Sequence, residues 1–265
     1  MSPSNLFIAL VQTNLYWKDK VANMAMLEEK IYQIPERVDL IVLPEMFPTG
    51  FTMDTVEVGE PMNFTVTKWM KQMASHTGAV VTGSVIITEG GKHFNRMLWV
   101  FPDGQISYYD KRHLFRMAGE DKHFSMGKKK EVFELKGWKI SPQVCYDLRF
   151  PVWSRNIAER GEMAYDVLIN VASWPSPRVS AWDILLKARA VENLCYAIGV
   201  NRIGVDGNDV SYCGHSAVYG YKGDTIADLG EGEGIVVVEL DYRQLADYRD
   251  KFPAWEDADR FELLE

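Results

Sequence analysis

The chain is organised around residues 143–151, QVCYDLRFP. The apolar run from Trp138 to Val144 predicts a buried strand that ends at a cysteine, and Pro151 allows a helix to begin because proline fits the first helical turn. A thiol between a strand and a helix lies at a sheet edge, where backbone N–H groups of the following turn can face a developing oxyanion. Free cysteines are also common in protein cores, so position alone does not separate a nucleophilic Cys145 from a packed one.

Length and charge narrow the class of protein. The 265 residues suit one large domain or two small ones. A net charge of -8 without a long basic run argues against nucleic acid and against an anionic membrane surface as partners. Residues 1–10 lack the pattern of a signal peptide, and no apolar stretch approaches the length of a membrane span. We therefore expect a cytoplasmic protein.

The cysteines predict neither a disulfide framework nor a metal site. Cys145, Cys195 and Cys213 are odd in number and widely spaced, and no C-x-x-C pair occurs. Cys195 lies in an apolar strand, which favours core packing, and Cys213 is interpreted as a loop cysteine although it precedes Gly214 and His215. We expect no metal and no cofactor.

The order of predicted elements indicates one α/β domain with a layered sheet, residues 1–265, in which 241–265 form a C-terminal helix and tail. Apolar runs predict strands at 6–12, 39–43, 79–88, 94–101, 106–109, 132–135, 138–144, 166–172, 195–201, 216–221, 225–229 and 234–240. Helical periodicity and stop signals predict helices at 21–34, 64–76, 152–159, 179–193 and 241–250. Residues 116–130 read as a polar loop that we expect to close over the site.

Three predicted strands are followed by an unusual polar residue. Glu45 follows DLIVLP, Lys111 follows ISYYD, and Cys145 follows KISPQV. In layered α/β folds, residues beyond strand ends gather in one crevice, so these side chains are candidates for a common site. Each of them alone is more often ordinary surface or core.

Together the three side chains could catalyse one reaction. The carboxylate takes the thiol proton, the thiolate attacks a carbonyl carbon, and the ammonium with a backbone N–H stabilises the oxyanion. The carboxyl group then protonates a leaving amine and later activates water against the thioester. This is hydrolysis of a carbon–nitrogen bond through an acyl-enzyme, without a metal or cofactor.

The motifs LPEMFPTGF, YDKRHLF and VCYDLRFP resemble those of the carbon–nitrogen hydrolase (nitrilase) superfamily, in the family's order and over residues 6 to about 240. The resemblance implies a four-layer α-β-β-α sandwich, with Glu45 as base, Lys111 as oxyanion stabiliser and Cys145 as nucleophile. Many members carry a second glutamate after the lysine, and Glu120 in RMAGEDKHF takes that place. It is expected to position the substrate and tune Lys111; the alternative is a solvated loop carboxylate.

Further motifs are similar to those of the bacterial omega-amidases: FPTGFTMD, KRHLFRMAGE, NVASWPSPR, NRIGVDGND and YRDKFPAWEDADRF. The resemblance implies hydrolysis of the terminal amide of 2-oxo acids such as 2-oxoglutaramate and 2-oxosuccinamate, with release of ammonia. Such enzymes clear products of glutamine transamination, including during methionine salvage. The helix around 182–193 resembles one that family members use in dimer packing, so a homodimer is expected.

A monoamide of a dicarboxylic acid needs a cation for its free carboxylate. Arg149 and Arg178 are candidates for a bidentate grip, although Arg149 could instead form a structural ion pair. Related omega-amidases place an aromatic residue at the position of Trp174, and the bulky Trp174-Pro175 loop favours a small pocket. The residues predicted to bind substrate are Tyr146, Arg149, Trp174, Arg178 and Phe51.

Three alternatives stay open from the sequence. Another branch of the superfamily is one: a nitrilase, an N-carbamoyl amidase or a hydrolase of deaminated glutathione. A Cys–His hydrolase with His113 as general base is the second, since His113 lies two residues from Lys111. The third is a binding protein that senses nitrogen metabolites, against which the presence of all three polar residues argues.

Overall fold

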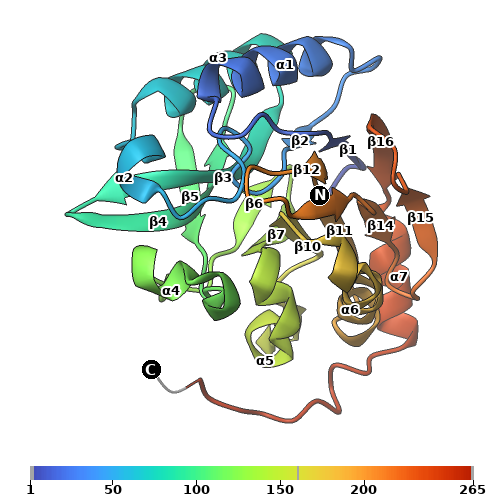
Figure 1. Cartoon of the computed structure of the whole chain (residues 1–265). Coiled ribbons are helices and arrows are strands. Elements are labelled where there is room, and N and C mark those ends of the chain that lie inside the picture. The colour runs from blue at the N-terminus through green and yellow to red at the C-terminus, as the bar shows by residue number, and fades with distance from the viewer. Residues whose placement is uncertain (1–2, 160, 264–265) are drawn as a thin grey trace.

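The computed structural model describes residues 3–159 and 161–263. Two six-stranded sheets stack face to face, and helices cover the outer face of each (Figure 1). This arrangement confirms the predicted four-layer α-β-β-α sandwich. Among the described residues, no helix is long and apolar enough to cross a membrane.

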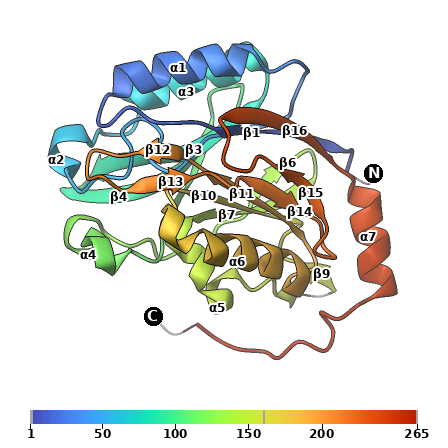
Figure 2. The ribbon, with the colours of Figure 1, turned by 45° about the vertical axis from the view of Figure 1, so that its right-hand side comes forward.

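The first sheet carries the amino-terminal half of the chain. Its strands are β1 Leu6–Gln12, β2 Leu40–Val42, β3 Val80–Glu89, β4 Lys92–Val100, β5 Ile106–Asp110 and β16 Gly234–Leu240. They lie in the order β16-β1-β2-β3-β4-β5, with β1, β2 and β3 parallel and the outer strands antiparallel. Helices α1 (Lys20–Tyr32) and α3 (Thr65–Thr77) cover its outer face, as Figure 2 shows.

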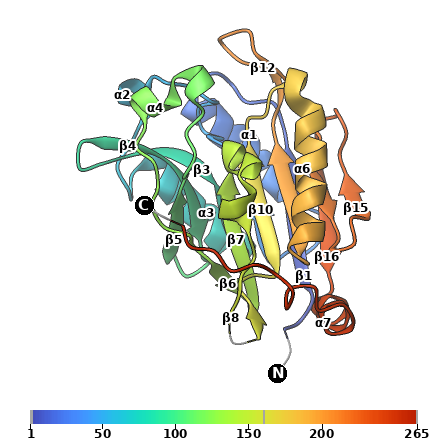
Figure 3. The same ribbon diagram turned by 90° about the horizontal axis from the view of Figure 1, so that it is seen from below.

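The second sheet carries the cysteine of the central motif. Its strands are β6 Phe133–Leu135, β7 Trp138–Val144, β10 Val167–Ala172, β11 Tyr196–Asn201, β14 Ala217–Tyr219 and β15 Thr225–Asp228, in the order β15-β14-β11-β10-β7-β6. The central strands β7, β10 and β11 are parallel. Helices α5 (Pro151–Ser154) and α6 (Val179–Glu192) lie on the outer side of this sheet, the side seen in Figure 3.

The alternation of side chains along each strand builds two cores from one sheet. In β1, Ile8 and Leu10 pack into the core shared with the second sheet, whereas Ala9 and Val11 pack with α1 and α3. A strand buried on both faces reads as a continuous apolar run, which is why these strands stand out in the sequence.

One predicted helix is wrong. The helix expected at 152–159 ends at Ser154, and Ala158–Glu159 form strand β8, paired with β9 (Glu162–Met163). Between the end of α5 and β8, buried Asn156 accepts from Tyr165 N–H and donates to the carbonyl oxygens of Tyr165 and Asn193. These contacts, distant in sequence, replace the bonds that further helical turns would have made.

Several short elements complete the chain. The segment 116–130, expected as a loop, contains a 3₁₀ turn (Arg116–Ala118) and helix α4 (Glu120–His123), and a further short helix is α2 (Thr55–Val58). Strands β12 (Ile203–Val205) and β13 (Ser211–Cys213) form a separate hairpin. The last helix, α7 (Tyr242–Lys251), begins after Asp241, whose side chain accepts from the N–H of Gln244. Residues 264 and 265 of the expected tail lie outside the described residues.

Candidate active site

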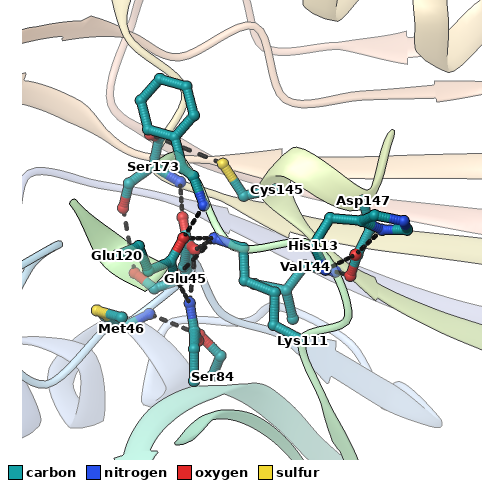
Figure 4. Close-up of polar contacts among 12 residues, drawn as sticks. Glu45, Met46, Ser84, Lys111, His113, Glu120, Val144, Cys145, Asp147 and Ser173 are labelled. Carbon is teal, nitrogen blue, oxygen red and sulfur yellow. Dashed lines mark hydrogen bonds and ion pairs between the residues drawn. The ribbon is translucent and has the colours of Figure 1, made fainter. Parts of the chain in front are cut away.

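The structure brings Glu45, Lys111, Glu120 and Cys145 together between the two sheets (Figure 4). Lys111 directly follows β5, Cys145 directly follows β7, and Glu45 follows β2 after two residues. The side chains of Glu45, Lys111 and Glu120 are fully buried, and Cys145 is 9% exposed. Polar residues beyond strand ends of facing sheets thus form one buried cluster.

Lys111 is the only cation within this cluster of four side chains. Its Nζ lies 3.0 Å from Oε1 of Glu45 and 2.9 Å from both carboxylate oxygens of Glu120. Burial alone would lower the pKa of Lys111, but the charges of Glu120 and Glu45 outweigh it and raise the pKa above its ordinary value. The ammonium is therefore charged at neutral pH.

Three donors hold the carboxylate of Glu45. Its Oε1 accepts from Lys111 and from Nδ2 of Asn95 at 2.7 Å, and its Oε2 accepts from the backbone N–H of Ser173 at 2.7 Å. The carbonyl oxygen of Ser173 in turn lies 4.0 Å from the sulfur of Cys145. The Ser173 backbone thus contacts both the nucleophile candidate and the base candidate.

Cys145 occupies a sharp turn between strand and helix. Its φ is +47°, in the left-handed region that non-glycine residues rarely adopt, whereas Val144 before it is extended. A 3₁₀ turn over Cys145–Arg149 follows, and the carboxylate of Asp147 accepts the N–H of Val144 at 3.1 Å. Burial, with the nearby charge of Glu45, raises the pKa of the Cys145 thiol well above its usual range. The thiol is therefore protonated at neutral pH and needs a base.

Glu120 is not a solvated loop carboxylate. It is fully buried at the start of α4, and its Oε2 also accepts the N–H of Phe115 at 2.6 Å. Burial and the charge of Glu45 raise the pKa of Glu120, against the opposing effect of Lys111. Through its ion pair with Lys111 and its hydrogen bond to Phe115, Glu120 connects the segment 115–120 to the cluster.

A pocket of about 540 Å³ opens from Cys145 to the surface. All the residues predicted to bind substrate line it: Phe51, Tyr146, Arg149, Trp174 and Arg178. Glu45, Lys111 and Glu120 are fully buried and are not among the residues that line the pocket. Cys145 is thus the member of the cluster that faces a bound molecule.

The two arginines of the pocket are held by aromatic rings and not by carboxylates. The guanidinium of Arg149 lies 4.9 Å from the ring centroid of Trp174, and that of Arg178 lies 5.7 Å from the ring of Phe115. Within residues 3–159 and 161–263, neither forms a salt bridge, so the alternative of a structural ion pair for Arg149 finds no partner there. Both keep their charge available for an anion.

The hairpin β12–β13 is a part of the pocket that the sequence did not indicate. Asp206, Asn208, Val210 and Tyr212 line the side of the pocket, although the motif NRIGVDGND was used only as a resemblance to the omega-amidases and no site residue was predicted in it. Asp206 accepts from the Tyr212 hydroxyl at 2.8 Å and from two backbone N–H groups of its own turn. The hydrogen bonds of its carboxylate therefore stabilise the turn of the hairpin.

His113 lies against Asp147 and not against Cys145. Its Nδ1 and backbone N–H lie 2.8 and 2.9 Å from Oδ1 of Asp147, and its ring stacks on Phe150 at 3.7 Å. We expect His113→Ala to lower the melting temperature, because a buried carboxylate loses a donor at a cost of about 1–3 kcal/mol. Turnover should fall less than tenfold, by steady-state kinetics. A loss as large as that of a Lys111 variant would favour the Cys–His alternative.

Comparisons with known proteins agree with this geometry. The carbon-nitrogen hydrolase family model matches residues 7–250. The omega-amidase YafV of Escherichia coli (strain K12) is 44% identical, over 97% of this chain and 98% of its own, and the 2-oxoglutaramate amidase of Bacillus subtilis is 33% identical, over 94% and 96%.

A solved structure of a related protein has the same fold as this chain. A CN-hydrolase superfamily protein from Xanthomonas campestris, which carries an arsenic adduct in its active site, superposes with a TM-score of 0.96 at 41% identity, covering 98% of this chain and 99% of that one. The chain therefore belongs to the carbon–nitrogen hydrolase family, as its motifs predict, and it is an enzyme that hydrolyses carbon–nitrogen bonds.

Proposed function

We propose that this enzyme is an omega-amidase that converts 2-oxo acid monoamides, such as 2-oxoglutaramate and 2-oxosuccinamate, to the 2-oxo dicarboxylate and ammonia. The observation that carries the proposal is a buried Glu–Lys–Cys cluster that opens through its cysteine into a small pocket with two unpaired arginines. The names of the relatives at 33% and 44% identity support the same substrate class.

The first half of the reaction forms a thioester. The thiol of Cys145 gives its proton to Glu45, and the thiolate attacks the carbon of the substrate amide. The resulting oxyanion is stabilised by the ammonium of Lys111, helped by the backbone N–H of Tyr146. When the tetrahedral intermediate collapses, the carboxyl group of Glu45 gives the proton to the leaving nitrogen, so that ammonia departs and the acyl group remains on sulfur.

The second half returns the free enzyme. Glu45, ionised again, takes a proton from a water molecule that attacks the thioester carbon. The second oxyanion meets the same donors, and its collapse releases the carboxylic acid product. Glu45 then returns the proton to the Cys145 sulfur. The carboxylate thus acts alternately as base and acid, while Lys111 keeps its charge throughout.

Glu120 has a different role in this proposal from Glu45. Its two oxygens are bound by Lys111 and by Phe115 N–H, and it does not line the pocket. It holds the ammonium in place and closes the cluster on the side of α4. The second carboxylate therefore positions Lys111, and it positions the substrate only through the pocket wall at 115–118.

Arg149 is the better placed of the two arginines for the substrate carboxylate. It ends the turn that begins with Cys145, and its planar group lies over Trp174, whose backbone is fixed on both sides by Asn201 at 2.7 and 3.0 Å. A guanidinium packed over an aromatic ring can still present its N–H groups for a bidentate contact with a carboxylate. Arg178 contacts the sulfur of Met117, which is 75% exposed, and so lies at the rim.

Ammonia release tests the proposal. We expect fast release from 2-oxoglutaramate and 2-oxosuccinamate and little from glutamine or a simple nitrile. Arg149→Gln should raise KM for the 2-oxo amides by about 10–100-fold, because a charge-assisted bidentate contact is lost. The same variant should leave turnover of butyramide, which has no carboxylate, nearly unchanged. If the wild-type enzyme releases no ammonia from either 2-oxo amide, the proposal is wrong and the substrate is that of another branch of the family.

We infer a homodimer in a reducing, cytoplasmic compartment. Helix α6 exposes Ile184 and Val191 on the outer face of the second sheet, and both would be covered by a second copy. The cysteines of the described chain are all free thiols, which a reducing compartment preserves. Sedimentation at micromolar concentration tests the dimer, and a monomer there would contradict it.

A further inference from the structure

Asn95 contacts both carboxylates of the buried cluster and the backbone of Lys111. It lies in β4 and is fully buried, and it does not line the pocket. Its side-chain Nδ2 donates to Oε1 of Glu45 at 2.7 Å and to Oε1 of Glu120 at 3.3 Å. Its backbone carbonyl accepts the N–H of Lys111 at 3.0 Å. No motif in the sequence analysis pointed to this residue.

The chemistry of the neighbours fixes the orientation of the Asn95 amide. Both groups that face it are carboxylate oxygens, so only the NH₂ end can be directed toward them. The other end, Oδ1, has no hydrogen-bond partner in the described part of the chain. A buried amide oxygen left unpaired costs about 1–3 kcal/mol. The unpaired oxygen of Asn95 therefore disfavours folding. What Asn95 contributes are the hydrogen bonds that its Nδ2 donates to the two carboxylates.

The donors around Glu45 leave a single place for an incoming proton. Each carboxylate oxygen has two lone pairs. Those of Oε1 are occupied by Lys111 Nζ and Asn95 Nδ2, whereas among the described residues Oε2 accepts only the N–H of Ser173. The carbonyl of that same Ser173 contacts the Cys145 sulfur, so Oε2 is the oxygen on the cysteine side (Figure 4).

We propose that Asn95 is a positioning residue that saturates Oε1 of Glu45 and thereby reserves Oε2 for the proton that moves between Cys145, the leaving nitrogen and water. It also offsets part of the excess negative charge, because the cluster holds two carboxylates and one ammonium. Without Asn95, Oε1 regains a free lone pair and the carboxylate can rotate away from the cysteine. The inference rests on the proposed role of Glu45 as base.

Two variants of Asn95 separate electrostatics from packing. Asn95→Leu removes the donor, and Asn95→Asp keeps the shape but places an oxygen against two carboxylates. With Asn95→Leu we expect the acidic limb of kcat/KM to move up by about one pH unit, because the ionised cluster loses a donor. The limb should move further with Asn95→Asp, since a like charge favours protonation. For both variants kcat should fall about 10–100-fold and KM should change less than about twofold.

The control is Asn193→Leu, which alters a buried amide far from the pocket. Asn193 is also fully buried with one unpaired side-chain atom, and its Oδ1 accepts the N–H of Asn156. It should lower the melting temperature as Asn95→Leu does, without moving the pH profile.

The variant Glu45→Gln separates the positioning role of Asn95 from the role of Glu45 as base. An acidic limb at the wild-type position in a folded Asn95→Asp enzyme would overturn the inference, even where Asn95→Leu does not fold, provided that Glu45→Gln lowers turnover by about 10²-fold or more. A loss of less than about tenfold in Glu45→Gln would instead overturn the proposed role of Glu45.

Discussion

Lys111→Met is expected to lower kcat by about 10³-fold or more in a protein that still folds. Methionine keeps much of the length of the lysine side chain but removes its charge. Loss of a single oxyanion donor costs about 10²–10³ in kcat, and here the lost donor carries a full charge and is fully buried. The loss should appear in kcat, because the charge of Lys111 acts on the oxyanion, which forms only during the reaction and not in the bound substrate.

The same variant should also lose stability in a way that depends on pH. Removing one partner of a buried ion pair costs about 3–5 kcal/mol, because Glu45 and Glu120 remain without a cation. Burial already raises the pKa of Glu120, and Lys111 is the group that opposes this rise. In the variant the folded protein therefore holds a proton that the unfolded chain releases, so stability is lost as pH rises above the ordinary value of 4.5 for glutamate. Thermal melts at several pH values measure this.

The double variant Lys111→Met/Glu120→Gln separates catalysis from stability. Removing one of the two carboxylates should recover part of the melting temperature and flatten its dependence on pH. It should recover no turnover, because the oxyanion still lacks its cation. If the double variant regained activity together with stability, Lys111 would matter only as a structural counter-ion, and the mechanism proposed above would be wrong.

Sequence patterns predicted the parts of the site that follow strand ends. Strand β7 was predicted with its observed bounds, 138–144, because an apolar run stops there at a cysteine followed by polar residues. Lys111 likewise follows a short strand, which was predicted at 106–109 and is observed at Ile106–Asp110. Such residues have a local signature, since a strand must end where its apolar run ends.

The rest of the site depends on contacts between distant segments. Asn95 lies 50 residues from Glu45 along the chain, and a lone amide in a strand has no local pattern that marks it. The segment around Glu120 is polar, so its composition indicated a solvated loop, whereas the ammonium of Lys111 stabilises the carboxylate inside the protein. The hairpin β12–β13 was overlooked because its strands have three residues each.

Glu45→Gln is expected to lower turnover of the 2-oxo amides by about 10²–10⁴-fold, since general acid–base catalysis contributes that much. The amide of glutamine can still accept from Lys111 and Asn95 through its oxygen. Its NH₂ end then faces the N–H of Ser173 and can accept no proton from the thiol. Steady-state ammonia release measures the loss, with Glu60→Gln as control. Glu60 is also a buried glutamate and binds the N–H of Val66, away from the pocket.

The reactivity of Cys145 should change in the opposite direction. Burial, followed by the charge of Glu45, raises the pKa of the thiol, so a neutral glutamine lowers that pKa. The rate of alkylation by iodoacetamide, followed against pH, should therefore rise at a lower pH in Glu45→Gln than in the wild type. A thiolate held by a cationic base behaves in the reverse way, because loss of the base raises the thiol pKa. A shift of the alkylation profile to higher pH would thus exclude Glu45 as an anionic base beside a protonated thiol.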